Sequence, residues 1–487
     1  MKEVMMLKDL LKELDYELIQ GDLYQDVLHL EYDSQKVKEG SLFICIKGFH
    51  KDGHHYINQA IENGAKMIVV EKDVEYIDGM TYIKVQNTRY ALALLSCAFF
   101  ENPSHKMKVI GITGTKGKTT LSFMIDSILR RAQHQVGLIG TIGTYIQGQI
   151  YQTKNTTPES YEIQKMMHKM VKRGCEYCIM EVSSQGLMLN RVAGIDFDYG
   201  IFTNLSPDHI GENEHHSFED YMMCKKKLFG MCKKGLFNKD DPYFQKMTHN
   251  ISCEILTYSI VKDSDLQAIH FEPTSFQHSL GMKFETEGKV KLSIEMMIPG
   301  QFNVYNALGA ILLCYDLHLP FETIQAGLKN LHVPGRLEIV PVPADYTVMI
   351  DYAHNPFAYD HLFQMLKDYH PVQIYCVYGA GGRRDRHRRF EVGAIVAKNH
   401  AFSIVTADNP RGEDVFRICH DIVKGIQAYN GDYVVIVDRK EAIYYALKHA
   451  QKGAIILCLG KGHEDYQIID QEPLPFSERK MIEEYFE

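Results

Sequence analysis

The segment Gly111-Ile-Thr-Gly-Thr-Lys-Gly-Lys-Thr-Thr120 indicates how the chain around it folds, because it joins two different apolar patterns. The run Lys108-Val-Ile-Gly-Ile112 before it predicts a buried strand, and apolar residues from Leu121 to Leu129 recur at helical spacing. Glycines at a helix start let backbone N–H groups wrap phosphate, while a lysine and a threonine can reach phosphate oxygens and Mg2+. The segment therefore predicts a nucleotide-binding strand, loop and helix.

The spacing of this loop is a variant of the common phosphate-loop pattern. Five residues, rather than four, separate Gly111 from Gly117, and the core of the motif is Thr113-Gly-Thr-Lys-Gly-Lys-Thr119. A glycine turn with a purely structural role is the alternative interpretation. It leaves Lys118 and Thr119 unexplained, so we favour the nucleotide site.

Composition limits the classes of protein that fit. A chain of 487 residues is too long for one hydrophobic core and predicts about three domains. With 45% hydrophobic and 24% charged residues it is typical of a globular protein. Its net charge of -9 argues against wholesale binding of nucleic acid or an anionic membrane, so an anionic ligand must meet a local cluster of positive charge.

The first residues and the cysteines indicate a cytoplasmic protein without membrane insertion. Residues 1–20 are amphipathic, with leucines at helical spacing among charged residues, and lack the unbroken apolar run of a signal peptide. The eleven cysteines are an odd, scattered set that favours reduced thiols. Cys175 and Cys178 form the one close pair, and core packing is the better interpretation because no second pair lies at zinc-site spacing.

Alternating strand-like and helix-like stretches predict an α/β protein with largely parallel sheets. We expect a small N-terminal α/β domain over 1–105, a central phosphate-loop domain over 106–332 and a C-terminal Rossmann-like domain over 333–487. In the last block, polar residues follow several predicted strands, where ligands of parallel sheets gather. These segments are Asp351 to Asn355, Gly379 to Arg389, Asp408 to Arg411 and Gly460 to Glu464.

The phosphate loop resembles that of Mur ligases and folylpolyglutamate synthases, and an ordered set of further motifs extends the resemblance over nearly the whole chain. Each motif alone is weak, but their order is specific to this family. The motifs are Asn155-Thr-Thr-Pro158, Glu181-Val-Ser-Ser184, Phe202-Thr-Asn-Leu-Ser206 with Asp208-His209, Asn303-Val-Tyr-Asn306, Gly335-Arg336, Asp351-Tyr-Ala-His-Asn355, Gly381-Gly382 with Arg384-Asp385, and Gly460-Lys-Gly-His-Glu464.

The resemblance implies an ATP-dependent ligase that forms an amide through an acyl-phosphate. Its implied catalytic residues are Lys118, Glu181, His209 and Lys225, with two Mg2+ ions at Thr119, Glu181, His209 and a Lys225 that CO2 converts to a carbamate. Without the resemblance, Lys225 is one of three consecutive lysines on a solvated segment. The residues implied to hold ATP are Gly114, Thr115, Lys116, Gly117, Lys118, Thr119, Thr120, Asn303, Arg336, Asp351, His354 and Asn355.

The same resemblance implies a UDP-N-acetylmuramoyl dipeptide as acceptor and a monomeric enzyme. Ser34 and His50 match the uridine-diphosphate site, although ordinary turn chemistry also explains the segments around them. The implied dipeptide residues are Asn155, Thr156, Thr157, Ser183 and Arg191. Gln185 and Leu189 depart from the family pattern, and the segment after Asp208 is two residues longer than the commoner form.

The amino acid added is expected to be meso-diaminopimelate, because Asp408-Asn-Pro-Arg411 has the form found in relatives that add it. Arg411 can meet the extra carboxylate of that substrate with a two-pronged hydrogen bond, whereas the ammonium of lysine would be repelled. The residues implied to hold the diamino acid are Arg384, Asp408, Asn409, Pro410, Arg411, Gly460 and Glu464. The same reaction with L-lysine, or a folylpolyglutamate synthase-like ligase, are the alternatives.

Two further patterns suggest rival classes. Asn238-Lys-Asp-Asp241 fits a guanine-binding motif of nucleotide-switch GTPases, but the preceding Met231 to Phe237 is expected to be a poor core strand. The basic run from Arg383 to Arg389 lacks the interleaved aromatic residues of a nucleic-acid surface and follows a glycine turn. A site for a small anion is the better interpretation of the second pattern.

Overall fold

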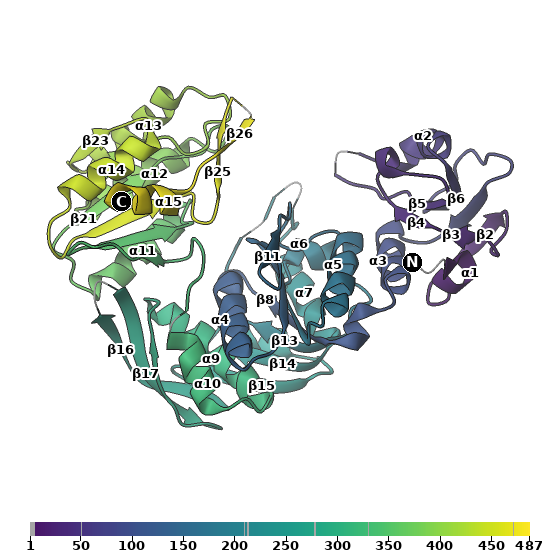
Figure 1. Cartoon of the computed structure of the whole chain (residues 1–487), viewed down its shortest axis with the longest axis horizontal. Helices are drawn as coiled ribbons and strands as arrows, with labels where there is room; N and C mark the ends of the chain where they lie inside the picture. Colours follow the sequence, from purple (N-terminus) through teal and green to yellow (C-terminus); the bar gives the residue numbers. More distant parts are fainter. Residues whose placement is uncertain are drawn as a thin grey trace. The chain divides into compact units, whose positions relative to one another are not determined.

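The computed structural model describes residues 5–49, 51–208, 210–211, 214–276, 279–329, 331–470 and 472–487. It divides into two compact units, Met1–Tyr258 and Ser259–Glu487, whose labelled elements appear in Figure 1. The predicted domain boundaries at 105/106 and 332/333 fall elsewhere than this division and stay a prediction.

The first unit begins with a five-stranded sheet of order β2-β7-β6-β5-β4, in which all pairs are parallel except β2 with β7. Residues 42–44 of β5 and 67–70 of β6 are unbroken apolar runs because both faces of the sheet are buried there. Leu42 and Met67 pack into one cluster, and Phe43 and Ile68 into the other. The elements are β2 (Glu17–Gln20), β4 (His29–Glu31), β5 (Ser41–Ile44), β6 (Ala65–Val70), β7 (Thr81–Lys84), α2 (Ile57–Glu62) and α3 (Thr88–Phe99).

The N-terminal leucines form a much shorter helix than their spacing indicates. Only α1 (Leu7–Leu10) is helical, and its Leu7 and Leu10 are buried in the core. Glu17–Gln20 instead forms β2, which leaves Leu18 39% exposed. Pairing with β7 satisfies the backbone N–H and C=O groups of this segment, and that tertiary contact outweighs the local apolar spacing.

The phosphate-loop sheet of the first unit has the strand order β11-β10-β9-β12-β8-β13-β14-β15. Strands from β9 to β15 in this order are parallel, while β10 and β11 form an antiparallel edge. The strands are β8 (Lys108–Thr113), β9 (Val136–Gly140), β10 (Gly143–Ile146), β11 (Gln149–Tyr151), β12 (Tyr177–Glu181), β13 (Phe197–Phe202), β14 (Cys232–Asn238) and β15 (Glu254–Ser259). The helices are α4 (Lys118–Arg131), α5 (Ser160–Lys172), α6 (Ser184–Met188), α7 (Phe218–Lys226) and α8 (Phe244–Thr248).

The expectation that Met231 to Phe237 is a poor core strand is wrong. β14 pairs in parallel with both β13 and β15, and its residues from Gly235 to Asn238 are buried. The lysines that made the segment look exposed, Lys233 and Lys234, lie at the start of the strand. Lys233 Nζ reaches Asp198 at 2.7 Å, so the charge is neutralised at the surface.

The second unit contains an antiparallel set, β16 (Leu266–Phe276), β17 (Ser279–Gly288) and β18 (Ser293–Met296), with helices α9 (Gln301–Asp316) and α10 (Phe321–Lys329). A six-stranded sheet of order β19-β20-β24-β21-β22-β23 follows, parallel except for β19. Its strands are β19 (Glu338–Val340), β20 (Thr347–Asp351), β21 (Ile374–Tyr378), β22 (Phe402–Val405), β23 (Tyr433–Val435) and β24 (Ile455–Leu459). Helices α11 (Pro356–Lys367), α12 (His387–Lys398), α13 (Val415–Gln427), α14 (Arg439–His449) and α15 (Glu478–Phe486) surround it (Figure 1), and β25 (Tyr466–Ile469) pairs with β26 (Glu472–Pro475).

These sheets confirm the predicted α/β class and place the polar motifs of the second unit at the carboxyl ends of its strands. Asp351 ends β20, the Asp408 motif follows β22, and Gly460 follows β24. All eleven cysteines are buried and free. Among the described residues, no helix combines the length and apolar character needed to cross a bilayer.

Candidate active site

The phosphate loop connects β8 to α4 as the sequence indicates. Gly114 and Gly117 have φ angles of 147° and 87°, which favour glycine, and a Cβ at Gly114 would collide with Thr203 Oγ1. Lys118 is the first residue of α4, and its Nζ donates to the carbonyl oxygens of Gly114 at 2.8 Å and Thr115 at 3.1 Å. The loop is thus folded around the lysine at the positive end of a helix dipole, where anions bind favourably.

Glu181 and Thr119 supply oxygen atoms beside this loop. Glu181 ends β12, is 1% exposed, and its Oε2 accepts a hydrogen bond from Thr119 Oγ1 at 2.9 Å. Thr141 donates to the same carboxylate from its backbone N at 3.0 Å and its hydroxyl at 3.1 Å. A carboxylate and a hydroxyl at this separation fit a hard cation such as Mg2+, which prefers oxygen ligands.

Lys225 is the one buried member of the three consecutive lysines. It lies on α7, is 2% exposed, and its Nζ donates to the Gly114 carbonyl at 2.9 Å. The same nitrogen lies 4.5 Å from the centre of the Tyr221 ring. Burial, followed by the nearby charge of Lys118, holds the pKa of Lys225 well below its ordinary value.

A cavity of about 320 Å3 brings the two lysines together with the predicted dipeptide residues. Thr157, another predicted dipeptide residue, is buried and is not part of the lining. Its carbonyl accepts from Arg191 and its hydroxyl from the backbone N of Ser183. Gln185 also faces the cavity, whereas Leu189 is not part of its lining. The lining residues are Lys118, Lys154, Asn155, Thr156, Ser183, Ser184, Gln185, Met188, Arg191, Glu214, His215, Tyr221 and Lys225.

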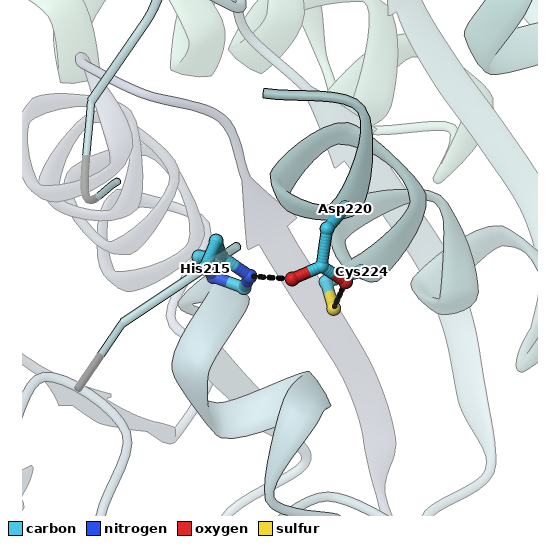
Figure 2. Close-up of side chains that lie close together, drawn as sticks. All are labelled: His215, Asp220 and Cys224. Atoms are coloured by element: carbon cyan, nitrogen blue, oxygen red, sulfur yellow. Dashed lines mark hydrogen bonds and ion pairs between the residues drawn. The ribbon is translucent and has the colours of Figure 1, made fainter. Parts of the chain in front are cut away.

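Several of these lining residues were missed at the level of sequence, and His215 is the most informative. Figure 2 shows its ring facing Asp220, with Nδ1 3.2 Å from Oδ2, while Cys224 Sγ lies 3.7 Å from Oδ1 of the same carboxylate. Asp220 and Cys224 are four residues apart and so share one face of α7. Their donor atoms could hold a divalent cation, and as they stand the contacts fix the start of the helix that carries Lys225. His209, the predicted metal ligand, lies outside the described residues.

The predicted uridine site is only partly described. Ser34 is buried and its hydroxyl donates to Gln59 Oε1 at 2.8 Å, while His50 lies outside the described residues. Arg89 on α3 donates to the Lys47 carbonyl at 3.1 Å and to Glu159 at 2.9 Å. Glu159 in turn lies 3.6 Å from Arg191, which lines the cavity. Arg89 and Glu159 therefore connect the backbone at Lys47 to a cavity residue.

The residues implied to hold adenine, ribose and phosphates lie in the second unit, and some have structural partners. Asn303 is buried, with its amide bonded to Pro299 and Asn306, and Asn355 caps α11 by accepting from Ala358 N. Burial raises the pKa of Asp351, whose carboxylate accepts from Leu337 N and Ala353 N at 2.8 Å.

An aromatic ring joins two of the family motifs in this region. The Arg336 guanidinium lies 4.6 Å from the centre of the Tyr352 ring, and His463 packs on the same ring. Burial, and then the charge of Arg336, lowers the pKa of His463 to about 4. His354 lies nearby in sequence but is exposed, with Nδ1 2.9 Å from the Tyr352 carbonyl.

The predicted diamino-acid residues meet at the ends of β22 and β24. Asn409 Nδ2 donates to Glu464 Oε2 at 2.9 Å, and a Cβ at Gly460, where φ is 105°, would lie 2.9 Å from Asp408 Oδ2. A Cβ at Gly381 would lie 3.2 Å from Arg411 NH1 and 3.5 Å from Arg384 Cγ, so both arginine side chains approach this glycine. The structure therefore brings together residues that are up to eighty positions apart in sequence, from Arg384 to Glu464.

The suspected guanine motif has internal structural roles. Asn238 donates to the Thr203 carbonyl at 3.0 Å and its Oδ1 accepts from Asp240 N, while Asp241 accepts from Leu205 N and Tyr243 N. These contacts tie the end of β14 to the segment after β13. They give the motif a structural explanation.

Family models match three segments of the chain. The Mur ligase family catalytic domain matches residues 26–100, the Mur ligase middle domain matches 112–314, and the Mur ligase glutamate ligase domain matches 335–462. The first segment covers β4 to β7, the second contains most of the phosphate-loop strands, and the third contains all six strands from β19 to β24.

Curated relatives match over their full length. The chain is 43% identical to the UDP-N-acetylmuramoyl-L-alanyl-D-glutamate--2,6-diaminopimelate ligase of Clostridium perfringens, covering 99% of this chain and 100% of that protein. It is 42% identical to the ligase of the same name from Caldanaerobacter subterraneus, covering 99% and 98%.

Solved structures agree with these matches. A structure of a UDP-N-acetylmuramoyl-L-alanyl-D-glutamate--2,6-diaminopimelate ligase has a TM-score of 0.73 and 26% identity, covering 99% of both chains. A folylpolyglutamate synthase from Mycobacterium tuberculosis has a TM-score of 0.61 at 17% identity, covering 77% of this chain and 92% of its own, and shares the fold. Together with the identity to full-length relatives, these likenesses show that the chain belongs to the Mur ligase family.

Proposed function

We propose that this protein is an ATP-dependent ligase that adds meso-diaminopimelate to UDP-N-acetylmuramoyl-L-alanyl-D-glutamate in peptidoglycan synthesis. The names of its relatives support the substrates. The observation that carries the chemistry is the cavity in which Lys118 of the phosphate loop, the buried Lys225 and Arg191 face the same space. Phosphate-loop, dipeptide and lysine residues converge there although they come from distant parts of the first unit.

The proposed reaction has two steps. An oxygen of the D-glutamate carboxylate attacks the γ-phosphorus of ATP, and the bond to the β–γ bridging oxygen breaks to release ADP. The amine of the diamino acid then attacks the acyl carbon, phosphate leaves, and the amine loses a proton. The ammonium of Lys118 and the N–H groups at the start of α4 stabilise the negative charge that develops on the phosphoryl oxygens.

Thr119 and Glu181 are the residues that would hold Mg2+, and their paired oxygens fit it. When bound, the ion would neutralise charge on the phosphates. His209 is the further proposed ligand. The proposed ATP residues of the second unit are Asn303, Arg336, Asp351, His354 and Asn355.

The proposal includes a carbamate on Lys225. A primary amine attacks CO2 only in its neutral form, and the lowered pKa of this buried lysine favours that form. The carbamate would replace a cation by an anionic oxygen donor, suited to a second Mg2+. Lys225 Nζ donates to the carbonyl of Gly114 in the phosphate loop. An oxygen donor at this position would lie close to the phosphates of bound ATP.

The test of the proposed function is phosphate release from ATP, measured with the nucleotide dipeptide present and a panel of amino acids supplied one at a time. We expect release with meso-diaminopimelate, little with L-lysine, and none when a folate replaces the nucleotide dipeptide. A wild-type enzyme that prefers L-lysine, or a folate with glutamate, would contradict the assignment.

A further inference from the structure

Lys461 is a buried lysine to which neither the family motifs nor the proposed mechanism assigns a task. It follows β24 and is 0% exposed. Its Nζ donates to Asn409 Oδ1 at 2.9 Å and to Glu464 Oε2 at 2.8 Å, and it lies 3.9 Å from Asp408 Oδ1. The two acceptors and the neighbouring carboxylate all belong to residues proposed to bind the diamino acid.

These contacts fix the orientation of both partner side chains. Asn409 Oδ1 also accepts from Ile468 N at 2.8 Å, and its Nδ2 donates to Glu464 Oε2 at 2.9 Å. Both donors to the Glu464 carboxylate, from Lys461 and from Asn409, therefore meet the same oxygen. Within the part of the chain that the structure describes, both of these hydrogen bonds leave Glu464 Oε1 for another donor, such as an ammonium group.

The charges of this cluster match one end of the proposed substrate. Asp408 and Glu464 carry two negative charges and Lys461 one positive charge, so the cluster is net negative and favours a cation. Arg411, which approaches Gly381, provides the complementary positive group. The far end of meso-diaminopimelate carries one ammonium and one carboxylate, which these two features would bind respectively.

A second buried ion pair holds the two strand ends on which the cluster is built. Arg439 is paired with Glu478, and its guanidinium donates to the carbonyls of Ala407 at 3.2 Å and Leu459 at 2.7 Å. Ala407 directly precedes Asp408, and Leu459 directly precedes Gly460. Arg439, and not Lys461, therefore holds the backbone next to Asp408 and Gly460, so the contacts of Lys461 act on the side chains of Asn409 and Glu464.

We propose that Lys461 is a positioning residue that orients Glu464 and Asn409 to recognise the amino group at the far end of the diamino acid. This inference rests on the proposed function. Lys461 acts through its two partners rather than by touching the substrate, so its removal weakens amino-acid binding and leaves the phosphate chemistry intact.

The test is Lys461→Met, which keeps the length of the side chain and removes its charge. We expect the KM for meso-diaminopimelate to rise by about 10- to 100-fold, the range for loss of charged hydrogen bonds, with kcat and the KM values for ATP and nucleotide dipeptide nearly unchanged. Lys461→Arg, which keeps the charge, should recover part of the loss. Lys452→Met is the matched control, because Lys452 is exposed in the same unit and pairs only with Asp345 among the described residues.

A substrate analogue separates this role from a general loss of structure. L-2-aminopimelate retains the far carboxylate and lacks the far amino group, so Lys461→Met should sharply reduce the preference of the enzyme for meso-diaminopimelate over this analogue. An unchanged preference, or a fall in kcat and melting temperature with all KM values constant, would overturn the proposal. If neither Lys461→Met nor Lys461→Arg folds, the lysine serves stability and the proposal is also wrong.

The wild-type measurements distinguish the two proposals. A wild-type enzyme without preference for meso-diaminopimelate over L-lysine contradicts the proposed function itself. A wild-type enzyme with that preference, and a Lys461→Met variant that keeps its discrimination against L-2-aminopimelate, contradicts only the role of Lys461.

Discussion

Lys225 in the first unit and Lys461 in the second are both buried, but their partners differ. Lys225 Nζ donates to a backbone carbonyl and lies over an aromatic ring, with the charge of Lys118 nearby. Lys461 Nζ also lies over an aromatic ring, 5.3 Å from the centre of Tyr466, but it meets the carboxylate of Glu464 at 2.8 Å. Among the described residues no carboxylate lies within ion-pair distance of Lys225, and burial outweighs the more distant charge of Asp208, so the lysine is driven toward its neutral, nucleophilic form. A lysine paired with a carboxylate can instead organise its neighbours. On the two proposals made above, the same residue type would serve chemistry in one unit and recognition in the other.

The largest effect should come from the groups around the phosphate loop that complete the Lys225 site. Lys118→Ala removes a charge from the phosphates and Glu181→Ala removes a proposed metal ligand, so each should lower kcat by at least about 100- to 1,000-fold. The measurement is steady-state phosphate release. Exposed Lys172→Ala is the control, and near-normal activity in either active-site variant would remove the proposed site.

Lys225→Ala tests directly whether Lys225 takes part in the reaction as a carbamate. We expect almost no turnover, with partial recovery when short carboxylates are added, because they can place an oxygen where the carbamate would lie. Lys226→Ala is the matched control, since Lys226 donates to the Lys246 carbonyl on the surface. Native mass spectrometry that finds an unmodified lysine in fully active, metal-loaded enzyme would contradict the carbamate.

Arg411→Ala tests the proposed recognition of the diamino acid in the second unit. Removing the guanidinium should reduce the ratio of kcat/KM for meso-diaminopimelate to that for L-lysine by about 10- to 100-fold, because a charged hydrogen bond to the extra carboxylate is lost. Arg417→Ala is a suitable control, since that arginine is exposed and pairs with Asp414. An unchanged ratio would show that Arg411 does not cause the preference.

The smallest effect concerns the dependence of stability on pH. In folded protein free of CO2 and metal, Lys225 loses its proton at a pKa well below 10.5, whereas the unfolded chain keeps that proton up to about 10.5. The unfolded state therefore binds more protons in this window, and stability conferred at this site is lost as the pH falls through the lowered pKa. We expect the melting temperature of wild type relative to Lys225→Met to rise as the pH increases toward about 10.5, the ordinary pKa of a lysine. A flat difference would show that Lys225 stays charged when buried.

Local patterns predicted much of this molecule correctly. The loop after β8, the strand that ends at Glu181 and the helix α9 follow from apolar runs, helical spacing and glycine placement. The sequence alone failed where a tertiary contact competed with a local pattern. Leu18 has helical spacing but lies in β2. Lys233 and Lys234 made the β14 segment look exposed in the sequence, although the rest of this strand is buried.

The phosphate loop, the family and the order of its motifs could be identified without coordinates, because each motif consists of residues that are neighbours along the chain. The three-dimensional fold was needed to show which of three lysines is buried, that His215 faces the cavity, and that Lys461 joins Asn409 to Glu464. Burial and charge pairing are properties of segments brought together from distant positions. Burial and charge pairing determine whether a lysine is neutral or charged, and the spacing of residues along the chain does not reveal either property.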